Sequence, residues 1–321
     1  MDSSNMIFAI LPAFIGAAVI FAIIFAVVAI VEGRHTAAKS GIIKQIYFYL
    51  VSILTLLISV VAIGFIVQTL LKSTAFPRAD SYDKASVTPP SLYLTSAKFP
   101  SETSTITCAT GCDLTESQKG DIANWSENYQ SWKQSQDMTA RRQRDLVAAI
   151  SVLLVALPLF YVHYRIIQKE NAAQTPDQRS LRMIRPTYFY IATFVGLGMI
   201  ITFGSLLINL VLKTYLFPKA NTADNSSDSY MMAVSPETSG AGTIQDCATA
   251  CNLDAKYVAS AEQYQVDYQD WQNRNRSAGR NDSEAARDIA FLVAAIPLFW
   301  YHWSKIRKES RDSSAPNQAN N

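Results

Sequence analysis

The sequence lacks the motifs on which most enzymes and nucleic-acid-binding proteins depend. Only 17% of its 321 residues are charged and three are histidine. It has no dense basic tract with interleaved aromatic residues, which would suggest binding to nucleic acid. It has no glycine-rich phosphate loop, no HExxH motif and no CxxCH motif for covalent haem. We therefore expect neither an enzyme nor a nucleic-acid-binding protein, and no catalytic residues, metal or cofactor.

Charge is also missing from long stretches of the chain. A helix needs roughly 17 to 25 mostly apolar residues to cross a bilayer. Uncharged, largely apolar runs occupy residues 6–31, 46–71, 146–164, 187–212 and 289–303. The sequence therefore predicts an all-α integral membrane protein with five transmembrane helices in the lipid bilayer. Because these runs contain no Asp, Glu, Lys or Arg, a channel or transporter is a weaker alternative.

Basic residues indicate the orientation of the chain. They follow the first, third and fifth predicted helices, at Arg34, Lys39 and Lys44, at Arg165, Lys169, Arg179, Arg182 and Arg185, and at Lys305, Arg307, Lys308 and Arg311. Short loops rich in Lys and Arg stay in the cytoplasm. We therefore expect a multi-pass protein of the cytoplasmic (inner) membrane with its N-terminus outside, its C-terminus in the cytoplasm and two long extracytoplasmic loops.

The four cysteines all lie in these two long loops, as Cys108 with Cys112 and Cys247 with Cys251. An oxidising compartment favours disulfides. Pairing within each CxxxC lets each loop close independently, so we expect Cys108–Cys112 and Cys247–Cys251, although four cysteines allow three pairings. A zinc site is the alternative, and it needs all four thiolates because neither loop contains histidine.

An internal repeat organises most of the chain. Tyr47-Phe48-Tyr49 returns as Tyr188-Phe189-Tyr190, and a Cys-Ala-Thr-x-Cys-x-Leu element at 108–114 returns at 247–253. Self-similarity of this kind indicates a duplicated structural unit. We divide the chain into an N-terminal helix with a short loop (1–41), a first hairpin (42–170), a second hairpin (183–309) and a tail (310–321). Each hairpin carries one long loop.

The two hairpins insert in the same direction, because each contributes an even number of spans. Parallel repeats are related by an axis along the membrane normal. The sequence thus predicts a four-helix bundle with a pseudo-twofold axis and the leading helix packed outside it. Small residues at Gly196, Gly198 and Gly204 indicate close helix packing.

The segments that repeat here resemble a bacterial membrane family catalogued only as a domain of unknown function. The resemblance rests on YFYLVSIL and LPLFYVHYRII in the first hairpin and on YFYIATFV and IPLFWYHWSKI in the second. It implies paired membrane helices in two tandem copies. It brings no established activity, and the long loops depart from the shorter connections of that family.

Each long loop also contains an amphipathic helical pattern after its cysteines. The apolar stripes are Trp125, Tyr129 and Trp132 in the first loop and Tyr264, Tyr268 and Trp271 in the second. A stripe facing water is costly, so we expect the two to pair, with Trp132 and Trp271 at one height. With no proline before Pro158, a continuous rod from about residue 115 to 168 is expected. The segments 76–107 and 217–246 are expected to be irregular.

His163 and His302 are repeat equivalents near the cytoplasmic interface. Haem b is held by paired imidazoles, so a haem between them is one hypothesis. Both are surrounded by Tyr and Trp, which is typical of an interfacial aromatic belt.

The leading functional hypothesis is a non-catalytic scaffold or accessory subunit of a larger bacterial membrane complex. Its partners are other membrane subunits or a second copy of the chain, bound through the aromatic stripes and helix surfaces. The alternatives are an electron-transfer anchor with haem b at His163 and His302, and a channel or transporter.

Overall fold

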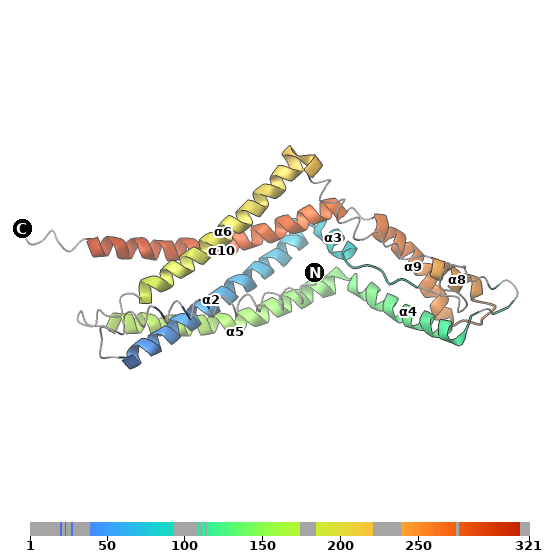
Figure 1. Ribbon diagram of the computed structural model, residues 1–321, viewed down its shortest axis with the longest axis horizontal. Helices are drawn as coiled ribbons and strands as arrows, with labels where there is room; N and C mark the ends of the chain where they lie inside the picture. Colours follow the sequence, from blue (N-terminus) through green and yellow to red (C-terminus); the bar gives the residue numbers. More distant parts are fainter. Residues whose placement is uncertain are drawn as a thin grey trace, which may run out of the picture. The chain divides into compact units, whose positions relative to one another are not determined.

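A computed structural model describes residues 20, 23, 27, 39–92, 108, 111, 112, 114–173, 184–220, 239–273 and 276–314. Where it describes the chain, regular structure is helical and no strand occurs (Figure 1). The chain divides into two compact units. We call them the span unit (1–75, 142–211 and 284–321) and the loop unit (76–141 and 212–283).

Four of the described helices are long and apolar enough to cross a membrane. The candidate spans are Lys44–Thr74, Met138–Glu170, Arg185–Leu216 and Gly279–Lys308. They belong to helices α2 (Lys39–Thr74), α5 (Met138–Ala173), α6 (Ile184–Val211) and α10 (Arg276–Ser314). The run at 6–31 lies outside the described residues apart from Ile20, Ile23 and Val27. The chain thus has the helices of a multi-pass membrane protein.

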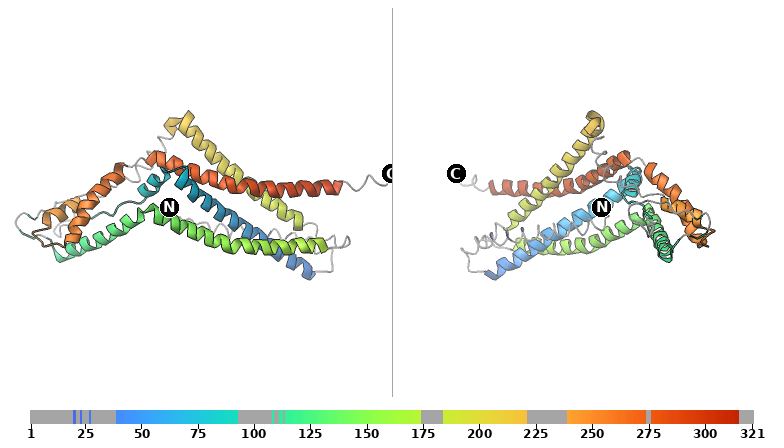
Figure 2. Two further views of the ribbon diagram at one scale, coloured as in Figure 1. Left: turned by 180° about the vertical axis from the view of Figure 1, so that it is seen from behind. Right: turned by 45° about the vertical axis from the view of Figure 1, so that its right-hand side comes forward.

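Within the span unit, α2 crosses α5 and α6 crosses α10, as Figures 1 and 2 show. Side chains of α2 and α6 also pack against each other. On α2, Tyr49 packs against Tyr188 of α6 with ring centroids 5.4 Å apart, and Ser52 Oγ lies 3.5 Å from the Tyr188 hydroxyl. Contacts between α2 and α6 therefore connect the two hairpins.

Repeat-equivalent helices are not equally buried, although a symmetric bundle would bury them equally. In the most apolar stretch of each span, 44% of the residues are buried in α2 but 17% in its repeat equivalent α6. The values are 39% for α10 and 11% for its equivalent α5. Phe291 of α10 is one reason, because it packs on Gly64 and stacks on Phe203, whereas the equivalent Val152 is exposed. The exposed apolar faces of α5 and α6 suit lipid.

The loop unit contains the helices α3 (Ala79–Ala85), α4 (Glu116–Ser135), α8 (Ser239–Cys247) and α9 (Ala255–Asn273). A five-residue π-helix, η2 (Leu212–Leu216), follows α6. The prediction that 76–107 and 217–246 are irregular was therefore wrong in part, since α3 lies in the first segment and α8 overlaps the second. Both are short helices without long apolar runs, so composition did not indicate them.

The predicted continuous rod is also wrong. The helix that begins at Glu116 ends at Ser135, and a new helix begins at Met138. At the break, Asp137 Oδ1 accepts hydrogen bonds from the backbone N–H groups of Thr139 at 2.9 Å and Ala140 at 3.3 Å. An acidic side chain that caps the first turn of a helix favours a start at that point.

Candidate functional site

The helices α4 and α9 are the framework of the loop unit, and side chains fix where each begins. Thr115 and Gln118 form a reciprocal capping box at the start of α4, with each side chain bonded to the other's backbone N–H. At the start of α9, Asp254 Oδ1 accepts from the Lys256 N–H at 3.0 Å. Apolar residues then recur every three or four positions, which gives each helix one aromatic face.

The two aromatic faces pack against each other. Along α4, Tyr129 stacks between Trp125 and Trp132, and along α9, Tyr268 stacks between Tyr264 and Trp271. The ring contacts that cross between the helices run through Tyr264, which meets Trp125 edge-on at 5.3 Å and Tyr129 at 5.5 Å. All six side chains are buried in one core. The stripes therefore supply the interior of this unit, and their faces are covered.

Polar contacts fix the relative position of α4 and α9. The Tyr129 hydroxyl donates to Asp267 Oδ2 at 2.6 Å, and Ser126 Oγ donates to Ser260 Oγ at 3.2 Å. Burial raises the pKa of Tyr129 above its ordinary value, and the hydrogen bond to Asp267 raises it further. Tyr129 therefore stays protonated at neutral pH and keeps this hydrogen bond.

The three tryptophans of the loop unit also bind the last residue of α3 and the segment that follows it. Each indole N–H donates to a backbone carbonyl oxygen: Trp125 to Pro90 and Trp132 to Val87, both at 3.1 Å, and Trp271 to Ala85 at 3.2 Å. Periodicity predicted that these residues are buried but not that they bind residues 85–90. The choice of Trp was the only signal, since a buried indole needs an acceptor for its N–H.

The disulfides join the two loops to each other, so our prediction of local pairs was wrong. Cys108 is bonded to Cys247 and Cys112 to Cys251, with Cα–Cα distances of 5.0 and 4.5 Å. Each bridge joins repeat-equivalent cysteines 139 residues apart. The pairing of α4 with α9 brings the equivalent ends of the two loops together. The Cys251 N–H donates to the Cys247 carbonyl oxygen at 2.9 Å, a helical turn whose side chains reach the opposite loop.

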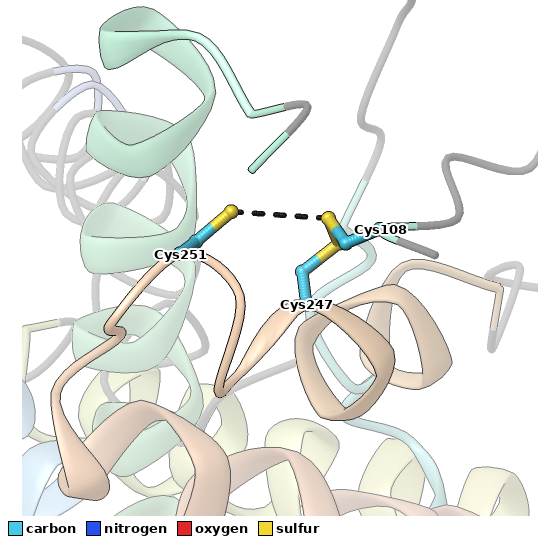
Figure 3. A group of neighbouring side chains, drawn as sticks. All are labelled: Cys108, Cys247 and Cys251. Carbon is cyan, nitrogen blue, oxygen red and sulfur yellow. Dashed lines mark hydrogen bonds between the residues drawn. A yellow bond between two sulfur atoms is a disulfide. The ribbon is translucent and has the colours of Figure 1, made fainter. Parts of the chain in front are cut away.

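A third sulfur contact links the two bridges. Cys108 Sγ lies 3.8 Å from Cys251 Sγ, the contact drawn as a dashed line in Figure 3. The Sγ atoms of Cys108, Cys247 and Cys251 all lie within 4.8 Å of one another. Such a group suits a soft metal ion only as thiolates. In the disulfide form the sulfurs are bonded to one another, so the zinc alternative applies only to a reduced protein.

A groove of about 740 Å³ lies between α4 and α9 on the surface of the loop unit. Its walls include both small polar and charged side chains: Ser126, Glu127, Gln130, Lys133, Lys256 and Gln263. Gln130 Nε2 donates to Ser260 Oγ at its base, at 3.3 Å.

The two histidines occupy equivalent environments in the span unit. His163 Nδ1 bonds to the Leu159 carbonyl oxygen at 2.7 Å, and His302 Nδ1 bonds to the Leu298 carbonyl oxygen at 2.8 Å. Each imidazole packs on the Tyr-Phe pair of its own hairpin: His163 on Tyr47 and Phe48, His302 on Tyr188 and Phe189. The aromatic belt therefore stays a prediction.

His302 differs from His163 in one respect. It is 2% exposed, and its Nε2 is buried without a hydrogen-bond partner. With the proton on Nδ1, this atom carries a lone pair that could bind a metal or accept a hydrogen bond. The Nε2 of His302, one of the two predicted haem ligands, therefore has no hydrogen-bond partner.

Asp288 is a buried acid that the sequence pattern missed. It is 1% exposed, and its Oδ1 accepts from Arg287 Nε at 2.9 Å. It stands immediately before the apolar run at 289–303, so it looked like the edge of a polar loop. Its repeat equivalent is Ala149, so this ion pair belongs to the second hairpin alone.

Comparison with known protein families gives one match. Residues 129–235 are similar to a family described as "Domain of unknown function (DUF5671)". The matched segment contains all of α5, all of α6 and the connection between them, so it covers parts of both hairpins. No curated protein and no solved structure matches the chain.

Proposed function

We propose that this protein is a non-catalytic scaffold or accessory subunit of a larger bacterial membrane complex. The observation that carries the proposal is the loop unit, in which two distant loops share one aromatic core and two disulfides. The shared core and the two bridges hold the two loops together in one unit. Its aromatic stripes are buried in its own interior. The proposed docking surface is therefore the groove between α4 and α9.

The proposal includes five transmembrane helices, with the N-terminal run at 6–31 as the first. It places the N-terminus and the loop unit outside the inner membrane and the C-terminus in the cytoplasm. Disulfides between the loops support this orientation because the cytoplasm keeps thiols reduced. The basic residues after the first, third and fifth helices support it independently.

Labelling of a single introduced cysteine tests the orientation. All four native cysteines are in disulfides, so a thiol reagent reports only on the new residue. In Ser314→Cys, we expect a membrane-impermeant maleimide to react only after the cells are permeabilised. Labelling at this position in intact cells would reverse the orientation.

We further propose two tandem copies of the hairpin. The same histidine contact recurs in both, His163 with Tyr47 and Phe48, and His302 with Tyr188 and Phe189. The DUF5671 match is a single stretch at 129–235 and spans the connection between the copies. The copies therefore rest on the sequence repeat and on these recurring contacts.

Co-purification from native membranes tests the scaffold function. We expect the tagged protein to purify with a stoichiometric partner, and Glu127→Lys in the groove to reduce the yield of that partner. Glu116→Lys, at an exposed position of the same helix outside the groove, should leave the yield unchanged. A protein that purifies alone, or equal loss with both variants, contradicts the proposal.

A haem-binding electron-transfer anchor is the second candidate. The free Nε2 of buried His302 is the observation that favours it. The visible spectrum of the protein purified from its native membrane tests it, because haem b gives an intense Soret band. We expect no Soret band for a scaffold. A band that His302→Leu abolishes would establish the haem function instead.

A further inference from the structure

The two disulfides of the loop unit differ in their access to solvent. Cys112 is exposed, whereas Cys108, Cys251 and Cys247 are 9%, 8% and 0% exposed. A thiol from solvent therefore meets the Cys112–Cys251 bridge first, and it meets this bridge at the Cys112 sulfur. The Cys108–Cys247 bridge is shielded by the core of the unit.

Cys251 belongs to the accessible bridge and also touches the shielded one. Its Sγ lies 3.8 Å from Cys108 Sγ, and in the oxidised protein neither sulfur carries a proton (Figure 3). If the bond to Cys112 breaks, the released Cys251 thiolate is already in contact with a disulfide sulfur. Thiol–disulfide exchange needs this approach of a thiolate to a bonded sulfur.

We propose that the four cysteines form an exchange site that accepts two electrons from a dithiol. One thiolate of the dithiol attacks Cys112 Sγ, the Cys112–Cys251 bond breaks, and Cys251 leaves as a thiolate. Cys251 then attacks Cys108 Sγ, which forms a Cys108–Cys251 bond and displaces Cys247, and Cys247 takes up a proton.

The second thiol of the donor completes the reaction. It attacks the donor sulfur that is bonded to Cys112, so the donor leaves as a disulfide and Cys112 becomes a thiol. The protein began with two disulfides and ends with one disulfide, Cys108–Cys251, and two thiols, on Cys112 and Cys247. Two electrons and two protons have passed from the dithiol to the protein. The loops stay joined throughout.

Cys108 rather than Cys247 is the sulfur that Cys251 attacks. Cys247 and Cys251 lie on one helical turn, held by the 2.9 Å hydrogen bond between their backbones. Asn252 then takes a left-handed φ of 49°, which ends the turn directly after Cys251. The sulfur in contact with Cys251 is across the interface, on Cys108.

Limited reduction of the full-length protein in detergent tests the exchange. We treat it with one equivalent of dithiothreitol, block thiols with N-ethylmaleimide, and locate blocked residues by tandem mass spectrometry that fragments the backbone between the cysteines of each loop. We expect blocked Cys112 and Cys247 and a Cys108–Cys251 bond. Blocked Cys112 and Cys251 with Cys108–Cys247 intact would overturn the proposal, as would a Cys247–Cys251 bond.

A pair of double variants gives a second measurement that does not depend on partial reduction. In Cys112→Ser/Cys247→Ser, only Cys108 and Cys251 remain, and we expect them to form a disulfide. In the matched Cys108→Ser/Cys251→Ser variant, the remaining Cys112 lies outside the group of sulfurs within 4.8 Å of one another. We expect mostly free thiols there. Free thiols in the first variant, or equal bridging in both, would contradict the proposed contact.

Discussion

Tyr129 shows how a single hydroxyl contributes to the pairing of α4 and α9. Its ring packs on Tyr264, and its hydroxyl donates to Asp267 at 2.6 Å. Tyr129→Phe keeps the ring and removes that donor. We expect the free energy of unfolding of the loop unit to fall by about 1.5 kcal/mol, the range of a hydrogen bond to a charged group that is partly screened by solvent.

Tyr268→Phe is the matched control for this change. The Tyr268 hydroxyl accepts from Gln272 Nε2 at 2.9 Å, within α9 and without a charged partner. We expect a loss of about 0.5 kcal/mol, the low end for a neutral hydrogen bond. Thermal unfolding followed by tryptophan fluorescence measures both. Equal losses in the two variants would mean that the hydrogen bond to Asp267 stabilises the unit no more than a neutral hydrogen bond does.

Glycine positions in α6 illustrate why small residues in a membrane helix are not equivalent. A Cβ at Gly196 would lie 3.1 Å from the backbone of Phe299 on α10, whereas a Cβ at Gly198 or Gly204 would meet nothing within 4 Å. The prediction that all three glycines serve close packing therefore holds for Gly196 alone. A Cβ at Gly196 would need the backbone of Phe299 to move by a few tenths of an ångström, so the close approach favours glycine at this position.

We expect opposite effects from two alanine substitutions in α6. Gly196→Ala forces α6 away from α10 and should lower the free energy of unfolding by about 1 to 3 kcal/mol, as overpacking does. Gly198→Ala should be neutral or stabilising by up to about 1 kcal/mol, because alanine favours the helix. Melting in detergent compares them. A tolerated Gly196→Ala would show that this contact is loose.

Among the helices, the break between α4 and α5 is the feature that most changes the predicted architecture. No proline interrupts the chain between Thr115 and Pro158, so the sequence alone predicts one rod. The hydrogen bonds to Asp137 Oδ1 cap the start of a second helix, so two helices form instead of one. Hydrogen bonds between a side chain and the nearby backbone compete with continuation of the helix. Composition and periodicity are poor predictors of such bonds.

Asp137→Ala tests whether this cap holds the break. The variant loses the acceptor for the N–H groups of Thr139 and Ala140, so we expect a loss of about 1 kcal/mol in stability. Ser135→Ala, which removes a bond from Ser135 Oγ to the Trp132 carbonyl oxygen at the same junction, should be nearly neutral. Increased stability or helicity in Asp137→Ala, by circular dichroism, would indicate that the sequence prefers a continuous helix.

For the whole molecule, the disulfides decide how the two halves of the chain are connected. Each bridge joins residues 139 positions apart, and the loop that the first bridge closes is long. Chain-entropy scaling gives about 5 kcal/mol for a loop of this order, against about 2 kcal/mol for the local pairs that we expected. The second bridge adds less, because the first already holds the loops together.

A chain cut between the hairpins tests this connection directly. We insert a protease site between Asp177 and Gln178, cleave the protein in detergent, and compare gels with and without reductant. We expect one species without reductant and two fragments with it. As a control, Cys108→Ser/Cys112→Ser removes the cysteines of the first loop, and its fragments should separate without reductant. If the fragments of the protein with all four cysteines separate without reductant, the disulfides are the local pairs Cys108–Cys112 and Cys247–Cys251.

The sequence by itself determined the elements and much of their grouping. Long uncharged runs predict α2, α5, α6 and α10, because the cost of exposing backbone and charge to lipid leaves few alternatives. The spacing of Trp125, Tyr129 and Trp132 predicts a buried helix face, and the repeat predicts its partner on α9. These features depend on local periodicity, which a single sequence displays.

Only the tertiary structure decided which side chains meet. It joined Cys108 to Cys247 instead of Cys112, because the paired helices bring the two loops together at equivalent positions. In the folded chain the tryptophan N–H groups also bind residues 85–90. Gly196, but not Gly198, lies against another helix, and Asp288 is buried. Each outcome depends on contact between segments distant in sequence, and no local period encodes the distance between them.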